Sequence, residues 1–139
     1  MTGDTFPDHS ARGITIKECV DGKSIRRCVF AFEKSEVVDR KEISIQWLDN
    51  QESVKQMKSR MKNEHPQFIL GFAVLKTSDL EELKYISDYR GMDYIRSPSS
   101  GNNYHGLITI TPQVNARLLA AELAIRAEKY EFSQELPVG

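Results

Sequence analysis

The 139-residue chain contains little cysteine and almost no excess charge of either sign. Its two cysteines are too few for a disulfide framework, and they do not form the Cys-x-x-Cys pairs typical of zinc or redox sites. The formal net charge is −1, so no overall positive field attracts nucleic acid or an anionic membrane. We therefore expect a protein without a cofactor, in a reducing, cytoplasmic setting.

Long hydrophobic runs are also missing. The longest continuous apolar run, at residues 68–75, falls far short of the roughly 20 residues that a membrane-spanning helix needs. Residues 1–12 are polar and carry no apolar signal segment. These observations predict a soluble chain that has no membrane partner.

The common catalytic signatures are absent from the sequence. It has no Gly-x-Gly-x-x-Gly, no Walker loop, no Gly-x-Ser-x-Gly and no His-Glu-x-x-His. The three histidines are His9, His65 and His105, and their positions give no reason to expect a metal site. These absences exclude only the protein families that depend on those motifs.

The composition is that of one ordinary globular domain, with 40% hydrophobic and 28% charged residues. A chain of this length can bury a core without metal or disulfide support. We expect residues 13–131 to form a single α+β domain, flanked by flexible tails at 1–12 and 132–139.

Two β-rich runs surround the sequence Asp-Gly-Lys-Ser and predict a hairpin. A four-residue loop places Val20 opposite Ile25, whereas a two-residue loop would place Ile16 opposite an arginine, so the four-residue loop is preferred. In that register Cys19 and Cys28 are not opposite each other. We expect both to be free, half-buried thiols.

The rest of the chain alternates between strand and helix patterns. The expected elements are strands at 13–20, 25–32, 42–48, 68–75, 93–96 and 104–110, and helices at 49–64, 78–85 and 112–130. Helix starts are indicated by Asp-x-x-Glu at 49–52, Ser-x-x-Glu at 78–81 and Thr-Pro at 111–112. The pattern predicts a mostly antiparallel or a mixed sheet of about five or six strands with two or three helices packed on it.

Two features of these strands indicate where the core lies. Ile43, Ile45 and Trp47 alternate with polar residues, which predicts one buried face and a core position for the only tryptophan. The run at 68–75 does not alternate, which indicates a central strand that is buried on both faces.

A loop rich in small polar residues, at 97–103, is the best candidate for a ligand site. Small residues let backbone amides approach an anion, and His105 at its end is a candidate general acid or base because histidine exchanges protons near neutral pH. If the flanking strands pair, the two ends of the loop meet. The candidate ligand-binding residues are Arg96, Ser100, Asn103 and Tyr104. The ligand would be a phosphate-bearing small molecule or nucleotide, and the alternative is an ordinary connecting loop.

The C-terminal helix suggests a different function. Its apolar surface, with Leu119 and Leu123 as candidate interface residues, is wider than one sheet face requires. An exposed stripe of this kind would bind a second copy of the chain or another protein. Such an interaction module is our first hypothesis, and the small-molecule site is the second.

A basic helix face supports the third hypothesis, nucleic-acid binding through residues 50–64. The basic residues are Lys55, Lys58, Arg60 and Lys62. Such a run is more often a solvated helix face, and no aromatic residues are interleaved with it to stack on bases. We therefore do not expect nucleic acid as a partner.

Overall fold

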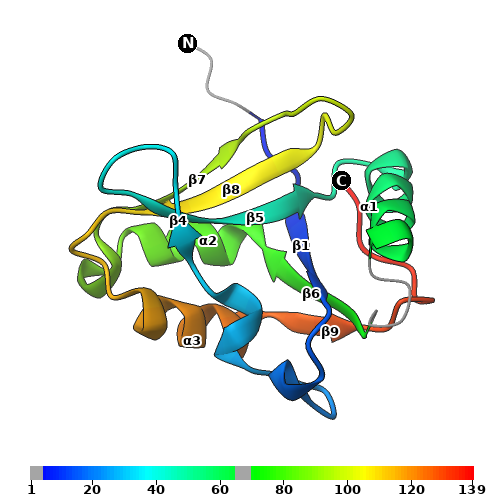
Figure 1. Cartoon of the computed structure of the whole chain (residues 1–139), viewed down its shortest axis with the longest axis horizontal. Helices are drawn as coiled ribbons and strands as arrows, with labels where there is room; N and C mark the ends of the chain where they lie inside the picture. The colour runs from blue at the N-terminus through cyan, green and yellow to red at the C-terminus, as the bar shows by residue number, and fades with distance from the viewer. Residues whose placement is uncertain (1–4, 65–69) are drawn as a thin grey trace.

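The computed structural model describes residues 5–64 and 70–139, and the chain folds into one large twisted sheet with helices on both faces, together with a separate two-stranded sheet (Figure 1). The strands are β1 (His9–Ile14), β2 (Val20–Asp21), β3 (Ser24–Ile25), β4 (Glu33–Lys34), β5 (Lys41–Trp47), β6 (Gly71–Lys76), β7 (Met92–Arg96), β8 (His105–Ile110) and β9 (Glu128–Tyr130). The helices are α1 (Gln51–Glu64), α2 (Thr77–Lys84) and α3 (Ala116–Arg126), with short 3-10 turns η1 (Lys17–Cys19), η2 (Arg27–Phe30) and η3 (Ser87–Tyr89).

The main sheet has the strand order β7-β8-β5-β1-β6-β9, and β4 pairs with one end of β5. All of these pairings are antiparallel. In the described part of the chain the sheet therefore has seven strands, one more than the upper expected number. The α+β class and the mostly antiparallel sheet are confirmed.

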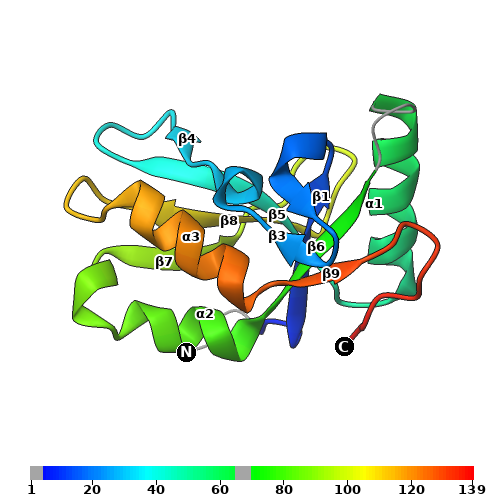
Figure 2. The same ribbon diagram turned by 90° about the horizontal axis from the view of Figure 1, so that it is seen from below.

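One face of the sheet carries the larger core, which lies beneath α2 and α3 (Figure 2). The alternating side chains of β5 point into it, and Trp47 is completely buried, as the sequence predicts. Leu80 and Leu83 of α2 belong to the same cluster. Each buried aliphatic side chain contributes roughly 1.5–3 kcal/mol to folding, so this face supplies most of the stability.

The helix α1 packs on the opposite face. Val54 and Met57 form a second core cluster with Phe72 and Val74 of β6. Ala73 and Leu75 belong to the larger cluster on the other side. β6 is therefore an interior strand that is buried on both faces, as expected, although residues 68 and 69 of the predicted strand lie outside the described residues.

Residues 9–12, which the sequence assigns to a flexible tail, lie inside the sheet. β1 pairs along its whole length with β6 and at its start with β5. Ser10 and Ala11 are 0% and 1% exposed, so this strand is buried through small side chains rather than a recognisable apolar pattern. The chain end also packs: the backbone N–H of Gly139 donates to the Leu48 carbonyl at 3.0 Å, and Leu136 is buried.

The helices do not begin at their expected caps: α1 and α3 begin later, and α2 begins one residue earlier, at Thr77. At α1 the reciprocal capping contacts join Asn50 and Ser53, one residue beyond the predicted pair. At α3 the side chain of Asn115 accepts from the backbone N–H of Leu118, so the cap is not the threonine before Pro112. No side-chain cap forms at α2 within the described residues. α3 also ends early, and the segment expected to continue it pairs with β6 as β9.

Of the predicted hairpin, only the residue pairs next to the turn are present in the structure. Val20 does lie opposite Ile25, but Asp21 also pairs with Ser24, which shortens the loop to two residues. Beyond these pairs η1 and η2 replace the expected long strands. Cys19 and Cys28 form a disulfide with a Cα–Cα distance of 5.6 Å, so the expectation of free thiols is wrong. The 3-10 turns bring the two cysteines together in a way that extended strands would not.

Reduction of this disulfide is expected to lower the free energy of unfolding by about 3 kcal/mol, because the bridge restricts a short loop in the unfolded chain. Urea unfolding with and without reductant measures the loss. A Cys19→Ala/Cys28→Ala double variant should show the same loss and no further response to reductant. An unfolding midpoint that reductant leaves unchanged would contradict the prediction.

In residues 5–64 and 70–139, every helix is too short or too polar to cross a membrane.

Candidate functional site

A cleft of about 420 Å³ opens between α1 and the adjoining strands, and we name it the α1 cleft. The C-terminal half of α1 forms one wall, and β1 and β5 form the floor. The loop at residues 97–104 closes one side with Ser99 and Asn102, and His105, the first residue of β8, lies next to it in the lining. Part of the loop that the sequence singled out therefore does line a cleft, together with elements that are distant along the chain.

The side chain of Gln46 connects the elements that form this cleft. Its side chain is 2% exposed, and its Nε2 donates to the carbonyl of Ser53 at 3.0 Å. Its Oε1 accepts from Arg60 at 3.2 Å and from Asn102 at 2.8 Å. One buried amide thus ties the sheet to both α1 and the loop. A satisfied buried network of this kind fixes the positions of the groups that it contacts.

Arg12 fills a gap in the sheet. β1 and β5 are paired only at the start of β1 and the end of β5. The Ser44 carbonyl, earlier in β5, therefore has no partner on β1. The guanidinium of Arg12 spans the gap, donating to the carbonyls of Ser44 at 2.7 Å and Val29 at 2.5 Å. Burial lowers the pKa of Arg12, and the neighbouring Glu33 partly opposes this effect. Arginine nevertheless stays charged in proteins, so a cation lines the cleft.

His105 lies directly opposite Gln46 in the β5–β8 pairing and is half-buried. Its Nδ1 is 2.8 Å from the carbonyl oxygen of Ser97. A carbonyl can only accept, so Nδ1 must carry the proton, and in the neutral ring Nε2 keeps its lone pair. His105 is thus held in one tautomer and lines the α1 cleft, which agrees with its expected role as a proton-exchanging group without testing it.

Arg96 does not share this cleft. The strands that flank the loop do pair, but Arg96 lies opposite Gly106, so its side chain is on the other face of the sheet from His105. Its guanidinium forms a two-point ion pair with Asp49, at 3.1 and 2.6 Å. It also donates to the Thr5 carbonyl. The anion cradle predicted between Arg96 and His105 therefore does not form.

The remaining loop candidates lie outside the α1 cleft. Ser100 and Asn103 are exposed on a tight turn in which Ser99 and Asn102 exchange backbone hydrogen bonds. Tyr104 is half-buried, and its backbone carbonyl accepts from the N–H of Trp47 at 2.8 Å. These residues shape the loop instead of lining the cleft.

The structure places Leu119 and Leu123 in the core. Both are 0% exposed and pack in the larger cluster under the sheet. The exposed apolar residues of α3 are Leu118 and Ile125, at 47% and 78% exposure. A surface on this helix would therefore use different residues from those the sequence indicated.

The basic face of α1 is partly occupied. Lys58 donates to the Gln134 carbonyl at 2.9 Å and lies over the ring of Phe132, while Arg60 binds Gln46. Lys55 and Lys62 are exposed. Two of the four basic residues thus serve contacts within the chain, which weakens the nucleic-acid hypothesis. Among the described residues no group of three potential metal ligands comes together; His65 lies outside them.

Sequence reasoning missed Arg12, Gln46 and Asn102 and read Arg60 as a solvated residue. Asn102 lies within the loop that was singled out, so its polar side chain was a usable signal. Arg12 and Gln46 had none, because their roles depend on strand pairing that the sequence does not reveal. Only the folded sheet brings these groups to one cleft.

No protein-family model matches the chain, and no curated protein or solved structure shows significant similarity to it.

Proposed function

We propose that this protein binds a small phosphate-bearing molecule in the α1 cleft. The observation that carries the proposal is that Arg12 and Arg60, from separate elements, line one cleft with His105. Among the described lining residues Glu64 is the single acidic one, so positive charge predominates. Guanidinium groups match the geometry of phosphate and form strong charge-assisted hydrogen bonds with it.

Arg12 and Arg60 already form hydrogen bonds within the protein, and this favours a pre-formed site. Two of the five N–H donors of Arg12 are engaged by backbone carbonyls, and the buried Gln46 amide fixes Arg60. Such anchoring reduces the entropy that binding must offset. His105 contributes the lone pair of Nε2, or a further donor when it is protonated. A role in proton transfer would extend the proposal from binding to catalysis.

Arg60→Gln is expected to weaken phosphate-ligand binding by roughly 10- to 150-fold, the loss of one charge-assisted hydrogen bond of about 1.5–3 kcal/mol. The measurement is a thermal-shift screen against inorganic phosphate, nucleoside monophosphates and sugar phosphates. A ligand at about 100 times its dissociation constant stabilises the native state by roughly 2.7 kcal/mol. His105→Gln is measured alongside.

The matched control is Lys62→Gln, which removes an exposed positive charge from the same helix outside the α1 cleft. It should leave the ligand-induced shift intact. If no probe stabilises the wild-type protein, or if Lys62→Gln abolishes the shift as fully as Arg60→Gln, the proposal is wrong.

As a second candidate, we propose association with a second copy or another protein through the outer face of α3. Leu118 and Ile125 are exposed and lie about two helical turns apart on the same face. Apolar side chains gathered on one exposed helix face are typical of a contact surface. An aspartate at Ile125, followed by light scattering, tests this surface without entering the core.

For the location of the protein, we propose an oxidising compartment in place of the cytoplasm expected from the sequence. The Cys19–Cys28 disulfide supports this, since disulfides persist in oxidising environments and are rare in the cytosol. Alkylation of the protein taken directly from cells, followed by mass spectrometry, tests it. Two alkylated cysteines would favour the cytoplasm.

A further inference from the structure

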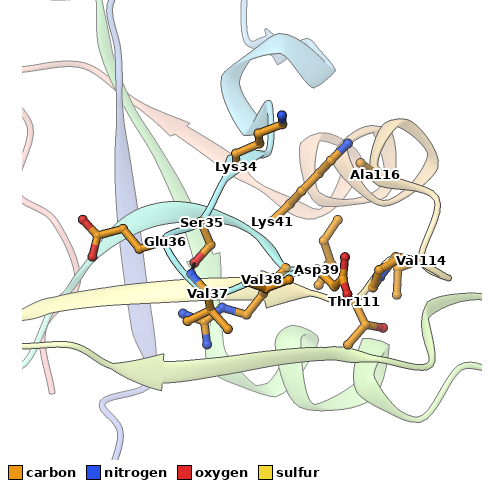
Figure 3. Close-up of a pocket in the computed structure, with 13 residues that line it drawn as sticks. Lys34, Ser35, Glu36, Val37, Val38, Asp39, Lys41, Thr111, Val114 and Ala116 are labelled. Carbon is orange, nitrogen blue, oxygen red and sulfur yellow. Dashed lines mark hydrogen bonds between the residues drawn. The ribbon is translucent and has the colours of Figure 1, made fainter.

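A second hollow, of about 480 Å³, lies beneath the loop at residues 35–40 that joins β4 to β5 (Figure 3). We name it the β4–β5 hollow. Its other wall runs from the end of β8 through the connecting segment to the start of α3, and it includes Ile110, Val114 and Ala116. It shares no lining residue with the α1 cleft, so the two can be tested independently.

The strand pairing beside this hollow puts like charges opposite each other. Glu33 lies opposite Glu42, and Lys34 lies opposite Lys41. Directly opposed like charges destabilise a pair of strands. The glutamates are compensated from within the chain: Arg40 is 3.4 Å from Glu42, and Arg12 interacts electrostatically with Glu33. The acidic half of this pairing therefore needs nothing from outside.

The positive charges of the two opposed lysines are not compensated in this way. Neither Lys34 nor Lys41 has an acidic group within 4.0 Å in the part of the chain that the structure describes. Both residues are exposed, and Figure 3 shows their side chains extending to the same side of the loop, Lys41 in the direction of Ala116. Two acidic residues also line the hollow: Glu36 points away from the lysines, and Asp39 forms no ion pair with either of them among the described residues. Two adjacent ammonium groups without a partner favour an anion between them.

The same hollow also has an exposed apolar rim. Val37 and Val38, at the tip of the loop, are 50% and 83% exposed, and both line the hollow. Deeper in it lie the side chains of Ile110 and Val114, which are buried. A ligand that carries only charge would leave this apolar surface in contact with water, whereas an apolar group attached to the anion would cover it.

We propose that the β4–β5 hollow binds a small alkyl carboxylate, that is, a carboxylate head attached to an apolar chain. The head lies between Lys34 and Lys41, and the chain packs against Val37, Val38 and Ile110. A volume of about 480 Å³ falls within the range of small-molecule sites. Its lining differs from that of the α1 cleft, which includes no lysine and no valine among the described residues.

The test is isothermal titration calorimetry of the intact protein with octanoate, with acetate and 1-octanol as separate probes. Acetate supplies the head alone and 1-octanol the chain alone, so each should bind at least about tenfold more weakly than octanoate. A Lys34→Gln/Lys41→Gln double variant should weaken octanoate binding by about tenfold or more, because two partly screened ion pairs are lost. Val38→Ser should weaken it by several-fold.

The matched control is Lys23→Gln/Lys76→Gln, which removes two exposed lysines that do not line the hollow. It should leave octanoate affinity unchanged. The proposal is overturned if octanoate gives no heat, if 1-octanol binds as tightly as octanoate, or if both lysine double variants behave alike. Backbone amide NMR shifts confined to the α1 cleft on addition of octanoate would also overturn it, without affecting the proposed phosphate site.

Discussion

Aspartate at Leu123 is expected to prevent folding, whereas aspartate at Ile125 should leave the fold intact. Leu123 is 0% exposed and packs in the larger core, while Ile125, two residues later on α3, is 78% exposed. Removing a buried leucine side chain costs about 2–5 kcal/mol, and an unpaired buried carboxylate adds several more. The sum is comparable to the roughly 5–15 kcal/mol that stabilises a typical domain.

Circular dichroism and urea unfolding measure the difference. Leu123→Ala, which avoids a buried charge, should remain folded but lose about 2–5 kcal/mol. Ile125→Asp should change the free energy of unfolding by no more than about 0.5 kcal/mol, as is usual at exposed positions. A folded, stable Leu123→Asp variant would mean that α3 does not pack on the sheet as the structure places it.

The same pair of variants separates a structural role of α3 from a role in association. If the outer face of α3 is a contact surface, the wild-type protein should show a concentration-dependent mass by light scattering, and Ile125→Asp should remain monomeric. A wild-type chain that stays monomeric at high concentration excludes self-association through this face. A hetero-partner would then be the remaining form of the second candidate.

The elements that the sequence predicted well are those whose signal is local. The alternation of Ile43, Ile45 and Trp47 needs no knowledge of the rest of the chain, because one polar and one apolar face define a half-buried strand. The strand β1 was not predicted, because it has no such local signal. Its buried positions hold Ser10 and Ala11, and only the strands on either side make them interior.

Boundaries were misplaced where two signals competed. Asp49 and Glu52 fit a capping box, but Asp49 pairs with Arg96, and Asn50 caps the helix instead. The two 3-10 turns cut the expected long hairpin down to its tip and brought the cysteines together. The sequence pattern does not show that Asp49 is taken by Arg96, which lies 47 residues away, and so does not show which residue caps the helix.

In the candidate site, too, some residues were recognisable from the local sequence and others were not. The loop at 97–103 and His105 were recognisable from composition, since small and polar residues cluster there. The cations that accompany His105 in the α1 cleft come from β1 and α1. Neighbouring side chains of one strand point to opposite faces, which is why Arg96, at the far end of the same loop, was a misleading choice.

Gly106→Ala is expected to lower the free energy of unfolding by about 3 kcal/mol, the upper range for overfilling a packed core. A methyl group at this position would overlap Nε1 of Trp47 and lie 2.9 Å from the carbonyl oxygen of Ile95. The indole cannot move aside easily, because it is 0% exposed and its Nε1 donates to that same carbonyl at 3.2 Å. The substitution should therefore both destabilise the protein and alter its tryptophan fluorescence.

Gly101→Ala is the matched control, because a methyl group there meets nothing within 4 Å and only the backbone φ of +83° opposes it. It should cost about 1–2 kcal/mol with no change in tryptophan emission. Combining Gly106→Ala with Trp47→Phe, which removes the overlapping atom, should cost less than the sum of the two single substitutions. Strict additivity, or unchanged fluorescence in Gly106→Ala, would show that the indole does not lie against β8, and the pairing of β5 with β8 that aligns Gln46 with His105 in the α1 cleft would lose its support.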